Sequence, residues 1–451
     1  MSSAEVDRAV RPLAGPARPL VLPGFERLEA AGALPLWFAR RPGVPEVSVR
    51  LVLEAGASDE PAAEAGLAEL TTRLLTEGTA ERDAQAMARW LDRLGVGFDA
   101  SAGYAVALLS LHTLTDVLEE AIGFLAEVVR RPTFPDAEVK RIRSERLDEI
   151  ERQRDEPAIV ADHALIGELY GDGLYGRPVG GTRETVVAID AASIRGFHER
   201  RYRPGRAFLL ACGDVDPGRV AAAVSERFGD WEGEVPAPFV PPPPPPTARR
   251  VILIDRPDSA QAEVRVATIG VPYGTPDHHA IILANAVLGG LFNSRINMNL
   301  REDKGWTYGA RSSFRFRRGA GPFVARTAVE TAVTAPAFEE ILGEIERMRS
   351  EPVSEEELEL ARHALTLSLP LQFETAAQIT RKVSRQRIYG LPEDYWETFR
   401  ERLEAVTPDE VTATCRRYLD PDRLVLLAVT DATATAAAME TLGEVRIEPF
   451  A

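Results

Sequence analysis

The sequence is poor in cysteine, in lysine and in long apolar runs. Its 451 residues include only Cys212 and Cys415, which excludes a disulfide framework and a thiolate metal cluster. The longest nearly apolar run, residues 280–292, is too short to span a bilayer. The first residues carry no continuous apolar core of the secretory type. We therefore expect a cytoplasmic protein that does not enter a membrane.

Basic residues are also fewer than acidic ones. Three lysines and fifty arginines leave a formal net charge of −16. A protein that binds nucleic acid needs a basic face to neutralise phosphates, so no nucleic-acid partner is expected. The sequence also lacks the glycine-rich phosphate loop, the dinucleotide-binding fingerprint and the serine nucleophile elbow. These absences exclude the common nucleotide-binding and serine-hydrolase chemistries.

Histidine is scarce as well, and no pair of histidines has the spacing of a zinc-binding helix. The pattern H-x-x-E-H and its inverse are both missing. His278 and His279 are adjacent, so on a helix their side chains point apart. We expect them at an ordinary solvated helix start. The six histidines are His112, His163, His198, His278, His279 and His363.

Proline is concentrated near the middle of the chain. Six consecutive prolines, residues 241–246, cannot enter a helix or a central strand. They predict a polyproline II segment of roughly 19 Å, at about 3.1 Å per residue. A semi-rigid spacer between two domains is the favoured interpretation, and a ligand for an aromatic groove is the alternative.

The two sides of this spacer repeat one pattern. Residues 116–138 and 336–358 each contain an amphipathic helix that is expected to end before a proline. In the second segment, apolar residues recur at i, i+3, i+4 and i+7. Residues 197–214 and 414–431 form a second matching pair. Both pairs are about 220 residues apart, which indicates a duplicated domain.

Each half also opens on an alternating strand, in residues 47–53 and 262–270. Short strands followed by amphipathic helices predict an α+β fold, in which each domain has a mostly antiparallel sheet with helices packed on one face. The expected divisions are an N-terminal tail at 1–20, a first domain at 21–235, a proline-rich linker at 236–248 and a second domain at 249–451.

Several long segments, in the right order, resemble the insulinase/pitrilysin family of zinc metallopeptidases, in particular its short, mitochondrial-processing-peptidase-like members. They include residues 44–70 (VPEVSVRLVLEAGASDEPAAEAGLAEL), 130–150 (RRPTFPDAEVKRIRSERLDEI) and 293–313 (NSRINMNLREDKGWTYGARSS). The resemblance extends from about residue 21 to residue 431. It implies two-domain chains that pair around a peptide-binding chamber.

Family peptidases carry H-x-x-E-H on the helix after the first strand, and a glutamate on a later helix completes the zinc site. Here the motif positions fall on residues 69–73, where Glu69 and Arg73 replace the histidines and Thr72 replaces the general base. The distal position falls on Glu149, which keeps its carboxylate. A guanidinium offers no lone pair to a metal and can instead pair with Glu69 or Glu149. We expect no metal in this chain.

The second half keeps another family feature. The resemblance assigns Arg301 and Tyr308, seven residues apart in LREDKGWTY, as donors to a substrate carbonyl and to its developing oxyanion. Without the resemblance, the same two residues read as a helix-end charge and a strand aromatic. Gly289 and Gly290 lie where processing-peptidase relatives have a glycine-rich substrate loop, which gives a weak indication of a substrate role.

Three hypotheses follow. In the first, the chain is the zinc-less subunit of a heterodimeric peptidase, not catalytic alone, which lends Arg301 and Tyr308 to a homologous zinc-binding partner that cleaves unfolded peptides. In the second, it is a non-enzymatic scaffold or peptide-holding subunit of the same fold. In the third, Glu69 and Glu149 form an unorthodox metal site.

Overall fold

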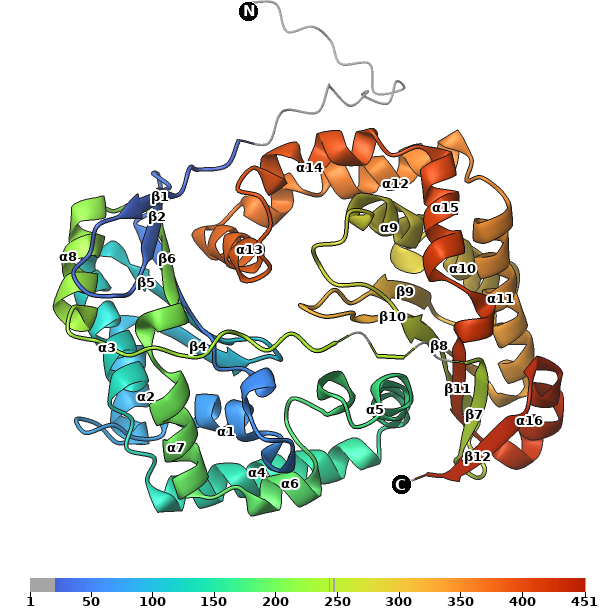
Figure 1. Ribbon diagram of the computed structural model, residues 1–451, viewed down its shortest axis with the longest axis horizontal. Helices are drawn as coiled ribbons and strands as arrows, with labels where there is room; N and C mark the ends of the chain where they lie inside the picture. Colours follow the sequence, from blue (N-terminus) through green and yellow to red (C-terminus); the bar gives the residue numbers. More distant parts are fainter. Residues whose placement is uncertain (1–20, 243, 246–247, 451) are drawn as a thin grey trace, which may run out of the picture.

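A computed structural model describes residues 21–242, 244–245 and 248–450. The expected tail at residues 1–20 and part of the proline run lie outside the described residues. Two six-stranded sheets with helices dominate the fold, one in each half of the chain (Figure 1). The α+β class and the two-domain architecture are therefore confirmed. No helix in the described ranges is long and apolar enough to cross a bilayer.

The first half contains β1 (Glu26–Leu28), β2 (Leu36–Arg40), β3 (Glu46–Leu53), α1 (Leu67–Arg73), α2 (Ala84–Leu94), β4 (Gly97–Ala102), β5 (Ala107–Leu114), α3 (Leu118–Arg130), α4 (Asp136–Arg154), α5 (Pro157–Tyr170), α6 (Arg183–Ala188), α7 (Ala191–Arg201), β6 (Phe208–Gly213) and α8 (Pro217–Phe228). Its strand order is β1-β2-β6-β3-β5-β4, and β2–β6 is the parallel pair.

The second half contains β7 (Arg250–Asp255), β8 (Gln261–Ile269), α9 (His278–Asn285), α10 (Arg295–Asn297), β9 (Ala310–Phe314), β10 (Pro322–Glu330), α11 (Thr334–Ser350), α12 (Glu355–Leu367), α13 (Ala376–Ile388), α14 (Tyr395–Glu404), α15 (Pro408–Tyr418), β11 (Val425–Thr430), α16 (Ala432–Met439) and β12 (Val445–Pro449). Its strand order is β12-β7-β11-β8-β10-β9.

The duplication expected from the sequence is present in the topology. The strands β2, β6, β3, β5 and β4 have the same order as β7, β11, β8, β10 and β9. The outermost strand breaks the match, because β1 precedes its neighbour in the chain and runs antiparallel to it, whereas β12 ends the second half and runs parallel to β7. The helices α3 and α11 occupy the repeated amphipathic segments, and both end before a proline.

Strand alternation explains how each sheet is covered. In β3, Val47, Val49 and Leu51 are buried with the helices of their own half. Ser48 points to the opposite face and makes a 3.0 Å hydroxyl–hydroxyl hydrogen bond to Thr380 of α13, a helix of the second half. Reciprocally, Leu165 of α5 packs with apolar side chains of the second sheet. Each half thus lends a helix to the other half's sheet, which the sequence patterns did not indicate.

A loop of the second half packs against the first half of the chain. The guanidinium of Arg317, between β9 and β10, lies 4.2 Å from the ring centroid of Tyr104 and 4.5 Å from that of Tyr175. Beside it, Arg318 donates two hydrogen bonds, of 2.7 and 2.5 Å, to Glu54. The loop therefore fixes how the two halves sit relative to each other.

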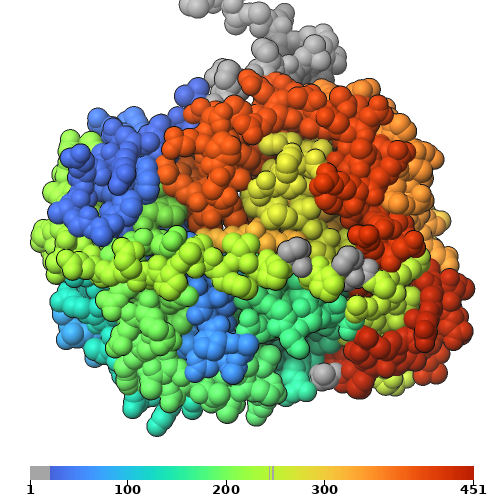
Figure 2. Space-filling model, viewed as in Figure 1, coloured from blue at the N-terminus to red at the C-terminus, as the bar shows by residue number. Residues whose placement is uncertain are grey.

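The linker follows the surface rather than standing free. The space-filling view shows its described residues crossing the face between the halves (Figure 2). Pro241 lies against Gly319, where an added Cβ would meet its ring at 2.9 Å. The described prolines of the run lie outside helices and strands, as expected for this residue type.

The two adjacent histidines contradict the expectation of a solvated helix start. His278 is only 5% exposed, and its Nε2 hydrogen bonds to the hydroxyl of Tyr395 at 2.9 Å. Burial, with smaller contributions from His279 and Arg385, lowers the pKa of His278 to about 3. The local sequence did not reveal this, because Phe316 and Tyr395, which pack against the ring together with the nearby Tyr273, come from distant segments.

This buried imidazole predicts a dependence of stability on pH. The folded-state pKa lies below the usual value of about 6.5, so below pH 6.5 the unfolded chain binds a proton that the folded chain does not. From pH 7.5 to 5.0, wild type should lose about 2 kcal/mol more unfolding free energy than His278→Gln. Urea unfolding at the two pH values measures this difference, and identical pH slopes for the two proteins would contradict it.

Candidate functional site

Helix α1, which carries the degenerate motif, is held in place at its start by Glu60. Its carboxylate accepts hydrogen bonds from the backbone N–H groups of Gly66, at 3.0 Å, and Ala68, at 2.8 Å. Gly66 adopts φ 100°, which favours glycine at this turn. Leu67 and Leu70 anchor the helix in the core. The face that carries Glu69 and Arg73 is thereby turned toward α4.

Arg73 occupies the centre of the degenerate site. Its two terminal nitrogens each donate a 3.0 Å hydrogen bond to a different oxygen of Glu149 on α4. The same guanidinium lies 3.8 Å from Glu69 and 4.0 Å from Glu145. The structure thus brings Glu69, Arg73 and Glu149 together, with the pairing expected from their chemistry. A bidentate fork of this kind is the most specific form of an arginine–carboxylate contact.

A second guanidinium completes the arrangement. Arg146, one turn before Glu149, donates a 3.1 Å hydrogen bond to Glu149 and a 2.9 Å bond to the carbonyl of Gly180. Burial raises the pKa of Glu149, but the hydrogen bonds from Arg73 and Arg146 outweigh it and hold the pKa below its usual value. Glu149 is therefore ionised and fully engaged at neutral pH.

Thr72, at the position of the family's general base, faces the core instead. Its side chain is buried, with the residue only 1% exposed. The hydroxyl donates to the carbonyl of Ala68 at 2.8 Å and lies 2.9 Å from the hydroxyl of Tyr202. A threonine held in this way cannot activate water, because a hydroxyl has no basicity near neutral pH.

These residues do not fit a zinc ion. A structural or catalytic zinc site needs at least three nitrogen, sulfur or carboxylate ligands converging on one point. Both oxygens of Glu149 are already held by guanidinium nitrogens, and no group of three histidine, cysteine or acidic side chains is placed to hold a metal in the described part of the chain. The cation at this position is the side chain of Arg73, which also leaves no room for the unorthodox site on Glu69 and Glu149.

Removing this guanidinium should destabilise the fold. Arg73→Met leaves Glu69, Glu145 and Glu149 close together without their shared cation, and we expect a loss of about 1–2 kcal/mol at pH 7, given partial solvent screening. Because the pKa of Glu149 is lowered in the folded state, this contribution should fade as the pH falls below about 4.5. Urea unfolding at pH 7 and pH 4 measures both effects.

The matched control is Arg219→Met, which also breaks a bidentate pair, with Glu119, made by two 2.9 Å hydrogen bonds from Nε and a terminal nitrogen and more exposed. Its loss should stay below about 1 kcal/mol. An effect of Arg73→Met no larger than that of the control would contradict a special role for the Arg73 cluster.

The second candidate pair lies in the other half. Arg301 belongs to a π-helical turn, η8 (Met298–Asp303), and its guanidinium lies 4.4 Å from the ring centroid of Phe292 and 3.1 Å from Glu302. Tyr308 sits in the loop before β9 rather than in the strand, and it is 96% exposed. An aromatic side chain so far from any packing partner has no structural role in the isolated chain.

The two glycines have different surroundings. Gly289 is buried, and an added Cβ would lie 2.5 Å from the hydroxyl oxygen of Ser312 on β9. Its small size is therefore required for packing. Gly290 is exposed and leads into Leu291 and Phe292, and the latter stacks with Arg301. Both glycines end a π-helical turn, η7 (Ala286–Gly290), rather than lying in the expected loop, and a substrate role for Gly289 and Gly290 stays a prediction.

Sequence reasoning missed three participants. Arg146 was detectable from its i, i+3 spacing to Glu149 on a predicted helix. Tyr202 and Phe292 were not, because their contacts with Thr72 and Arg301 depend on tertiary packing. In Figure 1, α1 and α10 lie in opposite halves of the molecule, so the degenerate metal site and the Arg301–Tyr308 segment belong to different domains.

Comparison with known families agrees with this division. The model of the insulinase family (peptidase family M16) matches residues 38–183, and that of the peptidase M16 inactive domain matches residues 188–365. The chain belongs to the insulinase family of peptidases. It is a member of that family without the histidines of the zinc motif.

Individual relatives cover nearly all of this insulinase-family chain. An uncharacterized zinc protease of Mycobacterium tuberculosis is 27% identical over 412 residues, 90% of this chain and 94% of the relative. A peptidase M16 inactive domain from Pseudomonas fluorescens has a TM-score of 0.83 at 28% identity, covering 90% of this chain and 98% of that one. A chain of complex III2 from Candida albicans has a TM-score of 0.76 at 14% identity, covering 93% and 100%, and shares the fold alone.

Proposed function

We propose that this chain is the non-catalytic subunit of a two-chain metallopeptidase. In this proposal Arg301 and Tyr308 enter the active site of a homologous subunit that carries zinc, and the substrate is an unfolded peptide. The observation that carries the proposal is the contrast between the two sites: Arg73 fills the metal position of this chain, whereas Tyr308 is 96% exposed. A side chain of this chain occupies the metal position of the first site, whereas Tyr308 at the second site is accessible to another molecule.

The segment around Arg301 supports a role at an interface. Phe292 is 66% exposed and Met298 is 39% exposed, and both belong to the segment around Arg301. Aromatic residues, methionine and arginine are the residue types enriched in the cores of protein–protein interfaces. Stacking on Phe292 also restricts the guanidinium of Arg301, so less side-chain entropy is lost when it binds a partner or a substrate.

The chemistry of the pair suits peptide hydrolysis. A guanidinium and a phenol hydroxyl both donate hydrogen bonds, and both can stabilise the oxyanion that develops when water adds to a peptide carbonyl. Arg301 can also bind the substrate backbone. The zinc, the activated water and the general base would all come from the partner subunit, because this chain carries none of these groups at residues 69–73.

The direct test uses a quenched fluorescent peptide. The lone chain is expected to show no hydrolysis, whereas the chain mixed with a homologous subunit that contains H-x-x-E-H should cleave the peptide, and a chelator should abolish the activity. Cleavage by the lone chain that a chelator removes would overturn the proposal.

A scaffold function is the second candidate, and it draws on the shared fold with the complex III2 chain. In that case Arg301 and Tyr308 would be remnants. The scaffold would be favoured if the chain associates with a homologous subunit but does not change its peptidase activity.

A further inference from the structure

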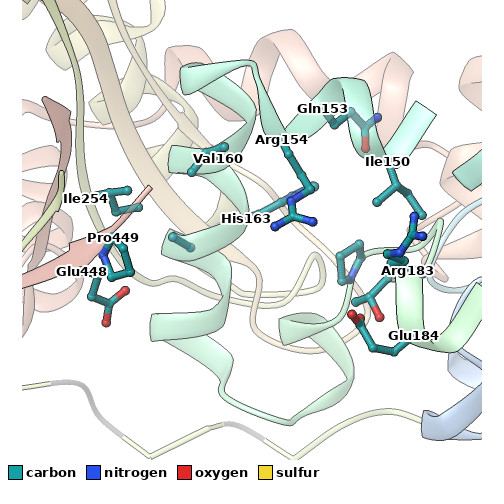
Figure 3. A pocket seen from close by; sticks show the side chains of 14 residues that line it. Ile150, Gln153, Arg154, Val160, His163, Arg183, Glu184, Ile254, Glu448 and Pro449 are labelled. Carbon is teal, nitrogen blue, oxygen red and sulfur yellow. The ribbon is translucent and has the colours of Figure 1, made fainter. Parts of the chain in front are cut away.

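A cavity lies apart from both sites described above. It has a volume of about 360 Å³ and is enclosed by the end of α4, α5, the start of α6 and the ends of β7 and β12 (Figure 3). The segment with Pro178 and Gly181 separates it from the degenerate metal site, because Gly180 within that segment lies against Glu69 and Arg146. The volume is at the lower end of the range for small-ligand pockets, about 300–1,000 Å³.

The interior walls of this cavity are apolar and come from both halves of the chain. Ile150, Val160 and Ala164 contribute from α4 and α5, and Ile254 and Pro449 contribute from the second half. In Figure 3, Ile254 and Pro449 lie on the left, Val160 lies on the helix in the middle and Ile150 lies on the right. An apolar ligand placed between them would bury surface against both halves, at about 25 cal/mol per Å².

Two arginines stand at the mouth. Arg154 ends α4 and Arg183 begins α6, and both line the cavity. Among the described residues, the only carboxylate within ion-pair distance of either guanidinium is Glu151, at 3.8 and 3.9 Å, too far for a hydrogen bond. Neither guanidinium therefore donates a hydrogen bond to a carboxylate of the described residues.

The other polar side chains of the wall do not supply the missing acceptor. Glu448 pairs with Arg446 at 3.0 Å. Glu184 is bound to its own backbone N–H and to Thr182, and the charges of Arg154 and Arg183 also contribute to lowering the pKa of its carboxyl, but it forms no ion pair with either arginine. His163 lies beside Arg154 in Figure 3, and burial lowers the pKa of its imidazole, so it is neutral at pH 7. Besides the neutral amide of Gln153, the hydrogen-bonding groups left at this side of the cavity are therefore the donors of the two arginines.

We infer that this cavity binds a carboxylate attached to an apolar body, with the carboxylate held by Arg154 and Arg183 and the apolar part inserted between Ala164 and Ile254. Two sources share this chemistry: a free apolar acid, and the C-terminal carboxylate of a peptide that ends in an apolar residue. The inference is independent of the proposed function, because binding here requires neither the partner subunit nor peptide cleavage.

Calorimetric titration of the full chain tests the inference with three probes: 4-phenylbutyrate, N-acetyl-Ala-Ala-Phe with a free carboxylate, and the same peptide as its C-terminal amide. Saturable binding of the first or the second probe without the amide supports the site and identifies the source. The affinity should fall as salt is raised, since both arginines are about half exposed. Binding of neither acid, or equal binding of the amide, would overturn the inference.

Two variants localise the binding. Arg154→Gln with Arg183→Gln removes the donors and should weaken binding by at least about tenfold. Ala164→Phe fills the apolar interior without changing the charge, and should weaken binding to a similar extent. The matched control is Arg89→Gln with Arg93→Gln, which removes two exposed arginines from α2 and should leave the affinity unchanged. Wild-type affinity in the Arg154/Arg183 variant would contradict the assignment.

Discussion

Replacing Arg301 with alanine, or Tyr308 with phenylalanine, is expected to lower the kcat of the two-subunit peptidase by roughly 10²–10³-fold in each case. Under the proposed function both groups would donate to charge that exists only in the transition state, so the expected loss is large. Donors that act there change kcat, whereas groups that only hold the substrate change KM. Steady-state kinetics on a quenched peptide separates the two effects, and Arg301 is expected to change both if it also binds the substrate backbone.

Both substitutions change few contacts of the isolated chain. Tyr308 is 96% exposed, and its change to phenylalanine removes a single hydroxyl. Arg301 contacts Phe292 and Glu302, both on the same surface segment. Gel filtration of the variant pair, together with its zinc content, establishes that assembly and the partner's metal are intact. Arg93→Ala, an exposed arginine on α2, serves as the control for loss of a surface cation.

The double variant distinguishes the two candidate functions. If the residues act on one oxyanion, their combined effect should be smaller than the product of the single effects, because groups that act as a unit are not additive. Undiminished kcat in the double variant would contradict the peptidase role and favour the scaffold. A fall in activity that follows loss of assembly would instead place both residues at the subunit interface alone.

The duplicated architecture could be read from the sequence because local periodicity specifies it. The stripe through Phe338 and Ile341 marks α11, and the alternation from Val47 to Leu53 marks β3. The exchange of α5 and α13 between the halves could not be read in this way. An apolar face indicates that a helix packs on a sheet, but it does not indicate on which of two similar sheets the helix packs.

The candidate site shows the same difference between features that the local sequence predicts and features that depend on contacts between distant segments. The pairing of Arg73 with Glu149 follows from charge and from the family motif, so the sequence was sufficient to anticipate it. The orientation of Thr72 toward Tyr202 was not predictable, because it depends on a residue 130 positions away. The burial of His278 was missed for the same reason, since Tyr395 lies 117 positions further along the chain. Contacts between distant segments leave no periodic signal near either residue.

A variant with Glu69→His and Arg73→His is expected to acquire a zinc site that the wild-type chain lacks. Residues 69 and 73 lie on one face of α1, and Arg73 reaches Glu69 and Glu149 at 3.8 and 3.0 Å. Two imidazoles would therefore converge with the carboxylate that the guanidinium releases, which provides the three ligands of an open zinc site. Arg146 would still donate to Glu149 and reduce its affinity as a ligand.

Metal analysis and thermal unfolding measure the gain. One zinc per chain should survive gel filtration, and zinc at 100 times its dissociation constant should add about 2.7 kcal/mol to the unfolding free energy. The control is Arg89→His with Arg93→His, which places two histidines at the same i, i+4 spacing on α2, on an exposed face. Adding Glu149→Gln to the site variant should remove most of the gain. Stoichiometric zinc in the wild-type chain would contradict the interpretation of Arg73 as the occupant of the metal position.

The zinc-loaded variant is nevertheless expected to leave peptides intact. Water bound to zinc needs a base beside it to become an effective nucleophile, and residue 72 remains a threonine bonded to Ala68 and Tyr202. A glutamate there would have to leave this core position, which is 1% exposed, to reach the metal. Restoring metal binding at residues 69 and 73 should therefore not restore hydrolysis, which also needs a base at residue 72.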